Sequence, residues 1–144
     1  MIKFIKSDDN SLTLYSERFG DVYHSVKGPI TEAYYIYIQN GLNNINRKIV
    51  SILDVGFGTG LNGLLTYHNS YKTNKEIFYT AIEYYPLELK IIKKLNYANL
   101  INPFLNDIYL EMHKMPFNTY KTICPHFNFL KLKIDLTKDF YLPH

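Results

Sequence analysis

The sequence predicts an α/β fold in which parallel strands alternate with helices. Three observations carry this prediction. The apolar run at 48–55 is bounded by turn residues, as expected of a buried parallel strand. Three glycines at alternate positions follow it in "DVGFGTGLN", and the helical pattern "LNGLLTYHN" begins directly after them. Two further strand patterns, at 76–83 and 127–135, are separated by helical segments.

The complete order is strand, helix, strand, helix, helix, strand, which is typical of a parallel sheet with right-handed crossovers and helices on both faces. The two later helices are expected at 86–96, with Pro86 in the first turn, and at 104–115, with Asn102 as the N-cap and Pro116 closing the helix.

The region before this sheet predicts a β-hairpin and one helix. The segments 11–16 and 21–26 are β-prone, and "ERFG" between them supplies a turn. "GPI" then breaks the pattern, and Thr31 suits the N-cap of an aromatic helix at 32–42. Its "YYIYI" run fits core packing at helical spacing, or alternatively a surface on which a nucleic-acid base stacks.

Length and composition indicate one modest domain, 1–144, because 144 residues with 47% hydrophobic content can build one core. A net charge of +3 is compatible with a nucleic-acid partner, but lysine-rich proteins without one look the same. The single cysteine, Cys124, excludes an internal disulfide and a cysteine-cluster metal site, so no metal is expected. Without an apolar run of ~20 residues or a signal-peptide core, we expect no membrane partner and a cytoplasmic location.

The glycine stretch predicts a ligand-binding loop, since strand, glycine loop and helix together form the nucleotide-type site of α/β sheets. No lysine follows Gly60, which excludes a P-loop, and Leu61 stands where a dinucleotide fingerprint needs its third glycine. Alternate glycines let backbone approach a ligand closely, which suits S-adenosylmethionine, a ligand without phosphate. A plain tight turn is the alternative.

Two acidic residues are candidates for contacts to such a ligand. Glu83 ends the second predicted strand at about the ~20-residue spacing expected of a group that accepts ribose hydroxyls. Asp135 ends the third predicted strand at the same sheet edge, where an adenine would lie. Either side chain could instead be a solvated charge at a strand end. His24 and His113 are the histidines to consider as bases, with a structural role as the alternative.

Three stretches carry a more specific resemblance: "SLTLYSERFGDVYHSVKGPITEAYYIYIQNGL", "ILDVGFGTGLNGLLT" and "FYTAIEYYPL". Over about 11–135 the chain resembles the MnmC/MnmD-like methyltransferase family of tRNA 5-methylaminomethyl-2-thiouridine synthesis. This implies the first half of a Rossmann-like S-adenosylmethionine methyltransferase sheet. It also implies a set of cofactor-binding residues: the loop Gly56, Phe57, Gly58, Thr59 and Gly60, then Glu83 at the ribose, Asp135 at the adenine, and Tyr23 and Glu32 near the pocket mouth.

The resemblance implies methylation of the aminomethyl nitrogen on the wobble uridine of tRNA. The family continues into a fourth strand whose Asp-containing motif faces the amine, and this motif is not found in the 144 residues. The resemblance therefore implies an incomplete domain without an identified catalytic residue, and an unpaired sheet edge through which the chain associates. Two functions stay open: a tRNA methyltransferase or its cofactor-binding half, and a non-catalytic S-adenosylmethionine-binding module.

Overall fold

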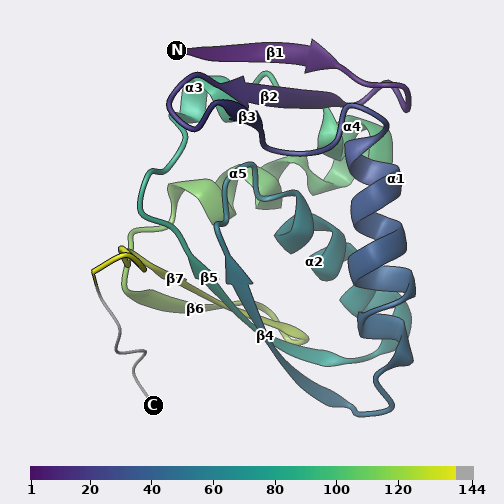
Figure 1. Cartoon of the computed structure of the whole chain (residues 1–144). Helices are drawn as coiled ribbons and strands as arrows, with labels where there is room; N and C mark the ends of the chain where they lie inside the picture. The colour runs from purple at the N-terminus through teal and green to yellow at the C-terminus, as the bar shows by residue number, and fades with distance from the viewer. Residues whose placement is uncertain (139–144) are drawn as a thin grey trace.

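The computed structural model describes residues 1–138 and contains two sheets with helices between them (Figure 1). The N-terminal sheet is antiparallel, with the order β1-β2-β3: β1 (Ile2–Lys6), β2 (Leu12–Ser16) and β3 (Asp21–Val22). The second sheet has the order β4-β5-β7-β6: β4 (Ile49–Val55), β5 (Glu76–Ile82), β7 (Phe127–Leu132) and β6 (Thr119–Cys124). Strands β4, β5 and β7 are parallel and β6 is antiparallel to β7, so the α/β prediction is confirmed with a mixed sheet.

The helices are more numerous than the sequence predicts, and the predicted helix after the glycines forms and is longer than 61–69. They are α1 (Pro29–Ala33), which continues as the π-helical η1 (Tyr34–Gln39), then η2 (Leu42–Asn44), α2 (Leu61–Thr73), α3 (Leu89–Ile92), α4 (Tyr97–Ile101), η3 (Pro103–Leu105) and α5 (Asn106–Lys114). The cap at Asn102 is confirmed, since its side-chain oxygen accepts a hydrogen bond from the backbone of Phe104.

The predicted hairpin forms, but its second strand is shorter than 21–26. At His24, the side-chain hydroxyl of Thr13 bonds the backbone in place of a partner strand. It donates to the carbonyl of His24 (2.9 Å) and accepts from its backbone N–H (3.1 Å). The strand β1, which the sequence analysis missed, pairs along the whole of β2.

Two helix predictions need correction. Thr31 is not an N-cap, because the first helix starts at Pro29 after Gly28, and Thr31 instead donates from its backbone and hydroxyl to Asp9. The helix expected at 86–96 is reduced to the single turn of α3. The chain turns at Asn96, whose side chain accepts from the Leu12 backbone and donates to the Asn10 carbonyl, which ties this turn to the N-terminal sheet.

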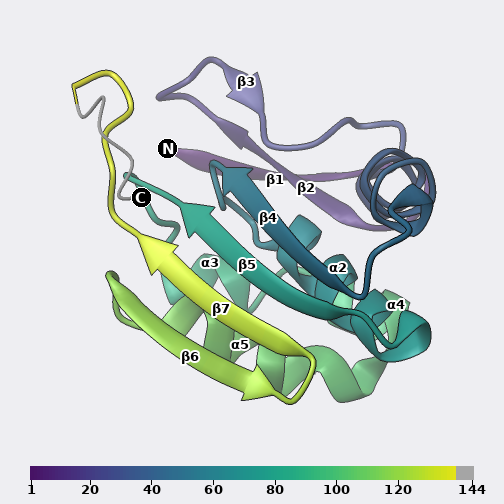
Figure 2. The same cartoon turned by 90° about the horizontal axis from the view of Figure 1, so that it is seen from below.

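Helices cover one face of the second sheet rather than both in the described part of the chain. Figure 2 shows α2 and α5 behind the sheet, over a face of buried side chains that includes Val50, Ile77, Tyr79, Phe127 and Phe129. The opposite face is open, and on it Ile49 is 60% exposed, Leu53 50% and Val55 59%. Strand β4 is an outer strand, since no other described strand pairs with its second edge.

The third parallel strand, β7, carries a buried lysine that bonds the end of α5. Lys131 is 4% exposed, and its Nζ donates to the last carbonyls of α5, at Met112 (3.2 Å) and His113 (2.7 Å). These are carbonyls that a helix end leaves without partners, so the cation satisfies them. Burial lowers the pKa of Lys131. Lys131 lies on the same face of β7 as the fully buried Phe127 and Phe129, and the half-buried Leu130 lies on the opposite face.

The aromatic run before the second sheet is not core. Four consecutive residues of η1 are exposed by 43 to 59%, namely Tyr34, Tyr35, Ile36 and Tyr37, while Ile38 is buried. The core-packing alternative is therefore wrong for these four side chains. No helix among residues 1–138 has the length and apolar character needed to cross a bilayer. The same residues contain no cluster of His, Cys, Asp and Glu that could hold a metal ion.

The open face and free edge of β4 predict association of the chain with itself, because exposed apolar edge strands template further pairing. We expect oligomers that grow with concentration in light scattering after size exclusion. Replacing Ile49→Lys and Leu53→Lys should shift the chain toward monomer by placing charges along the edge. Leu100→Lys, at a residue 47% exposed on α4, is the matched control and should leave association unchanged. A wild-type chain that stays monomeric at the highest soluble concentration would contradict this expectation.

Candidate functional site

The glycine stretch forms the loop between β4 and α2, and its glycines are required by the backbone. Gly56, Gly58 and Gly60 have φ of 84°, 50° and 72°, all in the left-handed region that other residues adopt only with strain. Gly60 is also the N-cap of α2, and a Cβ atom built on it would lie 2.6 Å from Nε2 of His113. The loop therefore needs glycine for its conformation and for the space around it.

The two larger side chains of the loop point into the protein and anchor it. Phe57 is 5% exposed and packs on the rings of His113 and Phe129, with centroid distances of 5.0 and 5.6 Å. Thr59 is 1% exposed. Phe57 and Thr59 are thus placed to shape the loop, and only their backbone is available to a ligand.

Three side chains from two parts of the chain hold Thr59. Its hydroxyl lies 2.6 Å from Nε2 of His24, which follows β3. Its carbonyl accepts from the hydroxyl of Tyr109 (2.6 Å) and from Nε2 of His113 (3.1 Å), both on α5. A carbonyl can only accept, so His113 carries its proton on Nε2. These bonds give both histidines a structural role beside the loop.

Four of the five N–H groups of the loop Gly56–Gly60 donate within the protein. Those of Gly56 and Phe57 donate to the Ile82 carbonyl, and that of Gly60 donates to the Phe57 carbonyl. The Gly58 N–H donates to Oε2 of Glu83. A phosphate-binding loop instead directs such groups at its ligand. This arrangement favours a ligand that needs close approach to backbone rather than a cradle for an anion.

Glu83 stands directly after β5 and fastens the loop to that strand. Its Oε2 accepts from Gly58 (2.8 Å), and its Oε1 accepts from the backbone of Tyr84 (2.8 Å) and Tyr85 (2.7 Å). A carboxylate offers about four acceptor positions, so three backbone donors leave room for one more. Glu83 therefore positions the loop and retains capacity for a ligand hydroxyl.

Three further residues are predicted from the sequence to lie at the ligand, namely Tyr23, Glu32 and Asp135. Tyr23 lies across Gly58, whose built Cβ would be 3.0 Å from its ring. Tyr23 and Glu32 line the same small hollow of about 230 Å³.

Asp135 lies three residues beyond the end of β7, because that strand stops at Leu132, and its Oδ1 accepts from the backbone and hydroxyl of Thr137. The prediction that Asp135 ends a strand is wrong.

Two polar residues beside the loop were missed by the sequence analysis. Asp54 near the end of β4 lines a cavity of about 530 Å³ together with Gly56 and Asn62. Burial raises the pKa of Asp54, and its Oδ2 accepts from the Tyr79 hydroxyl (2.7 Å). The buried Oδ1 of Asn62 has no hydrogen-bond partner within residues 1–138. The signal in the sequence is an acidic residue ending an apolar strand just before the glycines.

The sheet order, the left-handed glycine loop and the acidic residue after β5 define a Rossmann-like α/β fold. The structure is similar to the crystal structure of MnmC2 from Aquifex aeolicus, with a TM-score of 0.72 and 23% identity. The similarity covers 96% of this chain and 44% of that chain.

In sequence the chain is MnmC-like. It is 33% identical over 141 residues to the tRNA 5-methylaminomethyl-2-thiouridine biosynthesis bifunctional protein MnmC of Leptospira borgpetersenii, covering 89% of this chain and 20% of that protein. It is 29% identical over 104 residues to the protein of the same name from Campylobacter fetus, covering 71% and 17%. No family model matches the chain. The resemblance drawn from the motifs is confirmed, and the chain spans about a fifth of the length of these relatives.

The contact between Gly60 and His113 predicts a stability difference between two glycines. Gly60→Ala and Gly20→Ala both place a side chain at a φ near 70°, but a Cβ on Gly20 meets nothing within 4 Å. We expect Gly20→Ala to cost about 1–2 kcal/mol from backbone strain, and Gly60→Ala to cost ~1–3 kcal/mol more from overpacking. Urea unfolding of both variants measures the difference. Equal losses would show that His113 does not press on the loop.

The two histidines around Thr59 predict loss of stability in mild acid. Burial lowers the pKa of His24 and of His113 to about 4, while the unfolded chain titrates near the ordinary value of 6.5. The unfolded state then binds more protons, so the free energy of unfolding falls as pH decreases from about 6.5 to about 4. Each histidine contributes up to about 1.4 kcal/mol per pH unit.

This acid sensitivity can be measured from urea midpoints over that pH range. The variant His113→Gln should lose about half of the slope, because one of the two neutral buried imidazoles is removed. Wild-type stability that stays level between pH 6.5 and 4 would contradict the buried, neutral state of both rings.

Proposed function

We propose that this chain binds S-adenosylmethionine at the loop Gly56–Gly60, as part of a methyltransferase domain. The observation that carries the proposal is the left-handed glycine loop fastened to the carboxylate of Glu83 at the ends of two parallel strands. Ligands of open α/β sheets bind outside the carboxyl ends of the strands. The internal use of four of the five loop N–H groups supports a ligand without phosphate at this place.

The cavity beside the loop fits the chemistry of the cofactor. An unpartnered buried acceptor, Oδ1 of Asn62, and the carboxylate of Asp54 line the same cavity as Gly56. Unmade buried hydrogen bonds are costly, so this acceptor favours a ligand with a donor, such as the ammonium of an amino acid. The remaining acceptor position of Glu83 suits a ribose hydroxyl. Asp135 facing the adenine, and Tyr23 and Glu32 at the pocket mouth, remain part of the proposal.

S-adenosylmethionine supplies an electrophilic methyl group on a sulfonium. The residues of this chain would contribute orientation: the glycines admit the ligand close to the backbone, and Tyr23 limits its space over Gly58. We propose the aminomethyl group of the tRNA wobble uridine as the acceptor, since the relatives' names specify synthesis of that modified nucleoside. A cytoplasmic location is part of the same proposal.

Cofactor titration by calorimetry tests this proposal. Replacing Glu83→Gln should weaken binding of S-adenosylmethionine and S-adenosylhomocysteine about 10- to 100-fold, because a charged hydrogen bond to a hydroxyl contributes about 1.5–3 kcal/mol. The matched control is Glu76→Gln, at the opposite end of the same strand. Unfolding curves must show that both variants are folded. Unchanged affinity in a folded Glu83→Gln variant would overturn the assignment.

Methyl transfer by the isolated chain should be weak. Both carboxylates beside the loop are already engaged, Glu83 by three backbone N–H groups and Asp54 by the Tyr79 hydroxyl. In the proposed site the remaining acceptor positions of both carboxylates serve the cofactor, so neither is assigned to orient an acceptor amine, and positioned proton transfer is worth about 10²–10⁴-fold. Tritium transfer from labelled cofactor to tRNA carrying aminomethyl-uridine measures this. Turnover equal to that of the full-length Leptospira relative would place the catalytic group within these 144 residues.

A further inference from the structure

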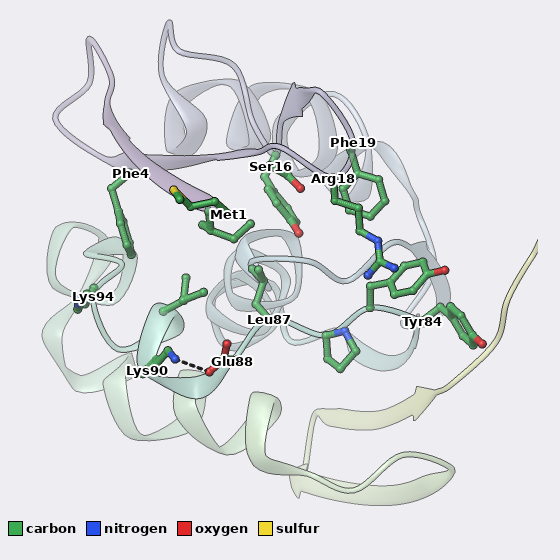
Figure 3. A pocket seen from close by; sticks show the side chains of 15 residues that line it. Met1, Phe4, Ser16, Arg18, Phe19, Tyr84, Leu87, Glu88, Lys90 and Lys94 are labelled. Carbon is green, nitrogen blue, oxygen red and sulfur yellow. Dashed lines mark ion pairs between the residues drawn. The ribbon is translucent and has the colours of Figure 1, made fainter.

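The largest cavity that we describe lies outside the glycine loop, between the N-terminal sheet and the segment from Tyr84 to Lys94. Its volume is about 810 Å³, within the ~300–1,000 Å³ range of ligand sites. Its side chains come from β1 and the turn after β2 on one side, and from the stretch around α3 on the other (Figure 3). We call it the aromatic trough, after the lining residues Phe4, Phe19, Tyr84 and Tyr85.

The aromatic side chains of the trough expose ring surface to solvent. Phe19 is 55% exposed, Tyr85 42% and Phe4 38%. The guanidinium of Arg18 lies 3.8 Å from the ring centroid of Tyr85, and its plane offers a further stacking surface. Aliphatic side chains complete the walls, among them Ile2, Leu87 and Ile91. Open rings beside such walls suit flat, partly apolar groups.

The charged side chains of the trough are mainly basic. Arg18, Lys90 and Lys94 line it, and Glu88 is the acidic residue among the lining side chains. Glu88 is paired with Lys90 at 2.7 Å, which leaves Arg18 and Lys94 as positive charges at opposite parts of the trough (Figure 3). Cations alternating with exposed rings are the pattern that binds single-stranded nucleic acid, where phosphates meet the charges and bases stack on the rings.

The trough reaches the candidate cofactor site through Tyr23. This residue lines the trough, and it also lines the 530 Å³ cavity that contains Asp54 and Gly56. Tyr84 and Tyr85 extend the trough directly from Glu83, which accepts their backbone N–H groups. A strand lying in the trough could therefore present a neighbouring nucleotide at the glycine loop.

We infer that the aromatic trough binds unpaired RNA nucleotides and leads the strand toward Tyr23. This inference rests on the proposed function, which requires an RNA substrate at the glycine loop. Unpaired nucleotides are specified because bases can stack on Phe4, Phe19 and Arg18 only when their faces are accessible. The cationic lining makes the cationic cofactor itself an unsuitable occupant of the trough.

The test uses fluorescence anisotropy with a labelled RNA hairpin of the anticodon type, and a fully paired RNA duplex for comparison. The wild-type chain should bind the hairpin more tightly than the duplex. The double variant Arg18→Gln/Lys94→Gln should bind more weakly and reduce the slope of log affinity against log salt by about 1.4, for two lost phosphate contacts. The variant Phe19→Ala should lower affinity about 5- to 150-fold with the slope unchanged, because stacking involves no counterion release.

The matched control is Lys48→Gln/Lys72→Gln, which removes two exposed lysines near the opposite end of the sheet and should keep both affinity and slope. An Arg18→Gln/Lys94→Gln variant that behaves like this control would overturn the inference, as would equal binding of duplex and hairpin or a wild-type chain that binds no RNA. Titration of S-adenosylhomocysteine into the same variants tests the proposed function separately. Its binding should be unchanged by the trough variants, and its absence in wild type would refute the cofactor assignment alone.

Discussion

The position of Thr59 is the constraint on which the rest of the site depends. Its hydroxyl is held by His24 from the N-terminal part of the chain, and its carbonyl is held by Tyr109 and His113 from α5. These contacts join three separate segments at one buried residue. Lys131 continues the connection, because it binds the last carbonyls of the same helix from β7. The glycine loop is thereby preorganised by the protein's own hydrogen bonds.

A loop held in this way leaves its glycine backbone as the surface available to a ligand. Two hollows with different chemistry lie beside this loop, the 530 Å³ cavity and the aromatic trough, and Tyr23 lines both. One has acceptors at Asp54 and Asn62, and the other is basic and aromatic. Hydrogen-bond acceptors favour an ammonium group, and cations favour phosphates. Under the proposed function, the cavity with Asp54 and Asn62 would therefore bind the methyl donor, and the basic trough would bind the RNA chain.

The sequence predicts helices on both faces of the second sheet, whereas the described helices cover only one of its faces. A strand such as β4 alternates its side chains between faces, so Val50 is buried while Ile49 and Leu53 are exposed. Both sets are apolar, as in strands buried on two sides. The sequence pattern thus predicts a fully covered strand, and the described helices cover only one side of it.

Several elements could not be predicted because distant contacts decide them. The strand β6 was missed since "TYKTIC" lacks a buried face and is held by pairing with β7. The helix expected at 86–96 yields to a turn at Asn96, whose side chain bonds to Asn10 and Leu12 far away in the chain. The strand predicted to reach Asp135 stops at Leu132, where its pairing with β5 ends.

The sequence by itself determined the parallel strands, the glycine loop and the position of Glu83, because strand periodicity, alternate glycines and a fixed spacing are local properties. Only the tertiary structure decided which loop side chains face inward, that Glu83 accepts from Gly58, and that Arg18 and Lys94 share one trough. Such arrangements join residues far apart in the chain, and hydrogen bonding and packing between them depend on how the elements come together.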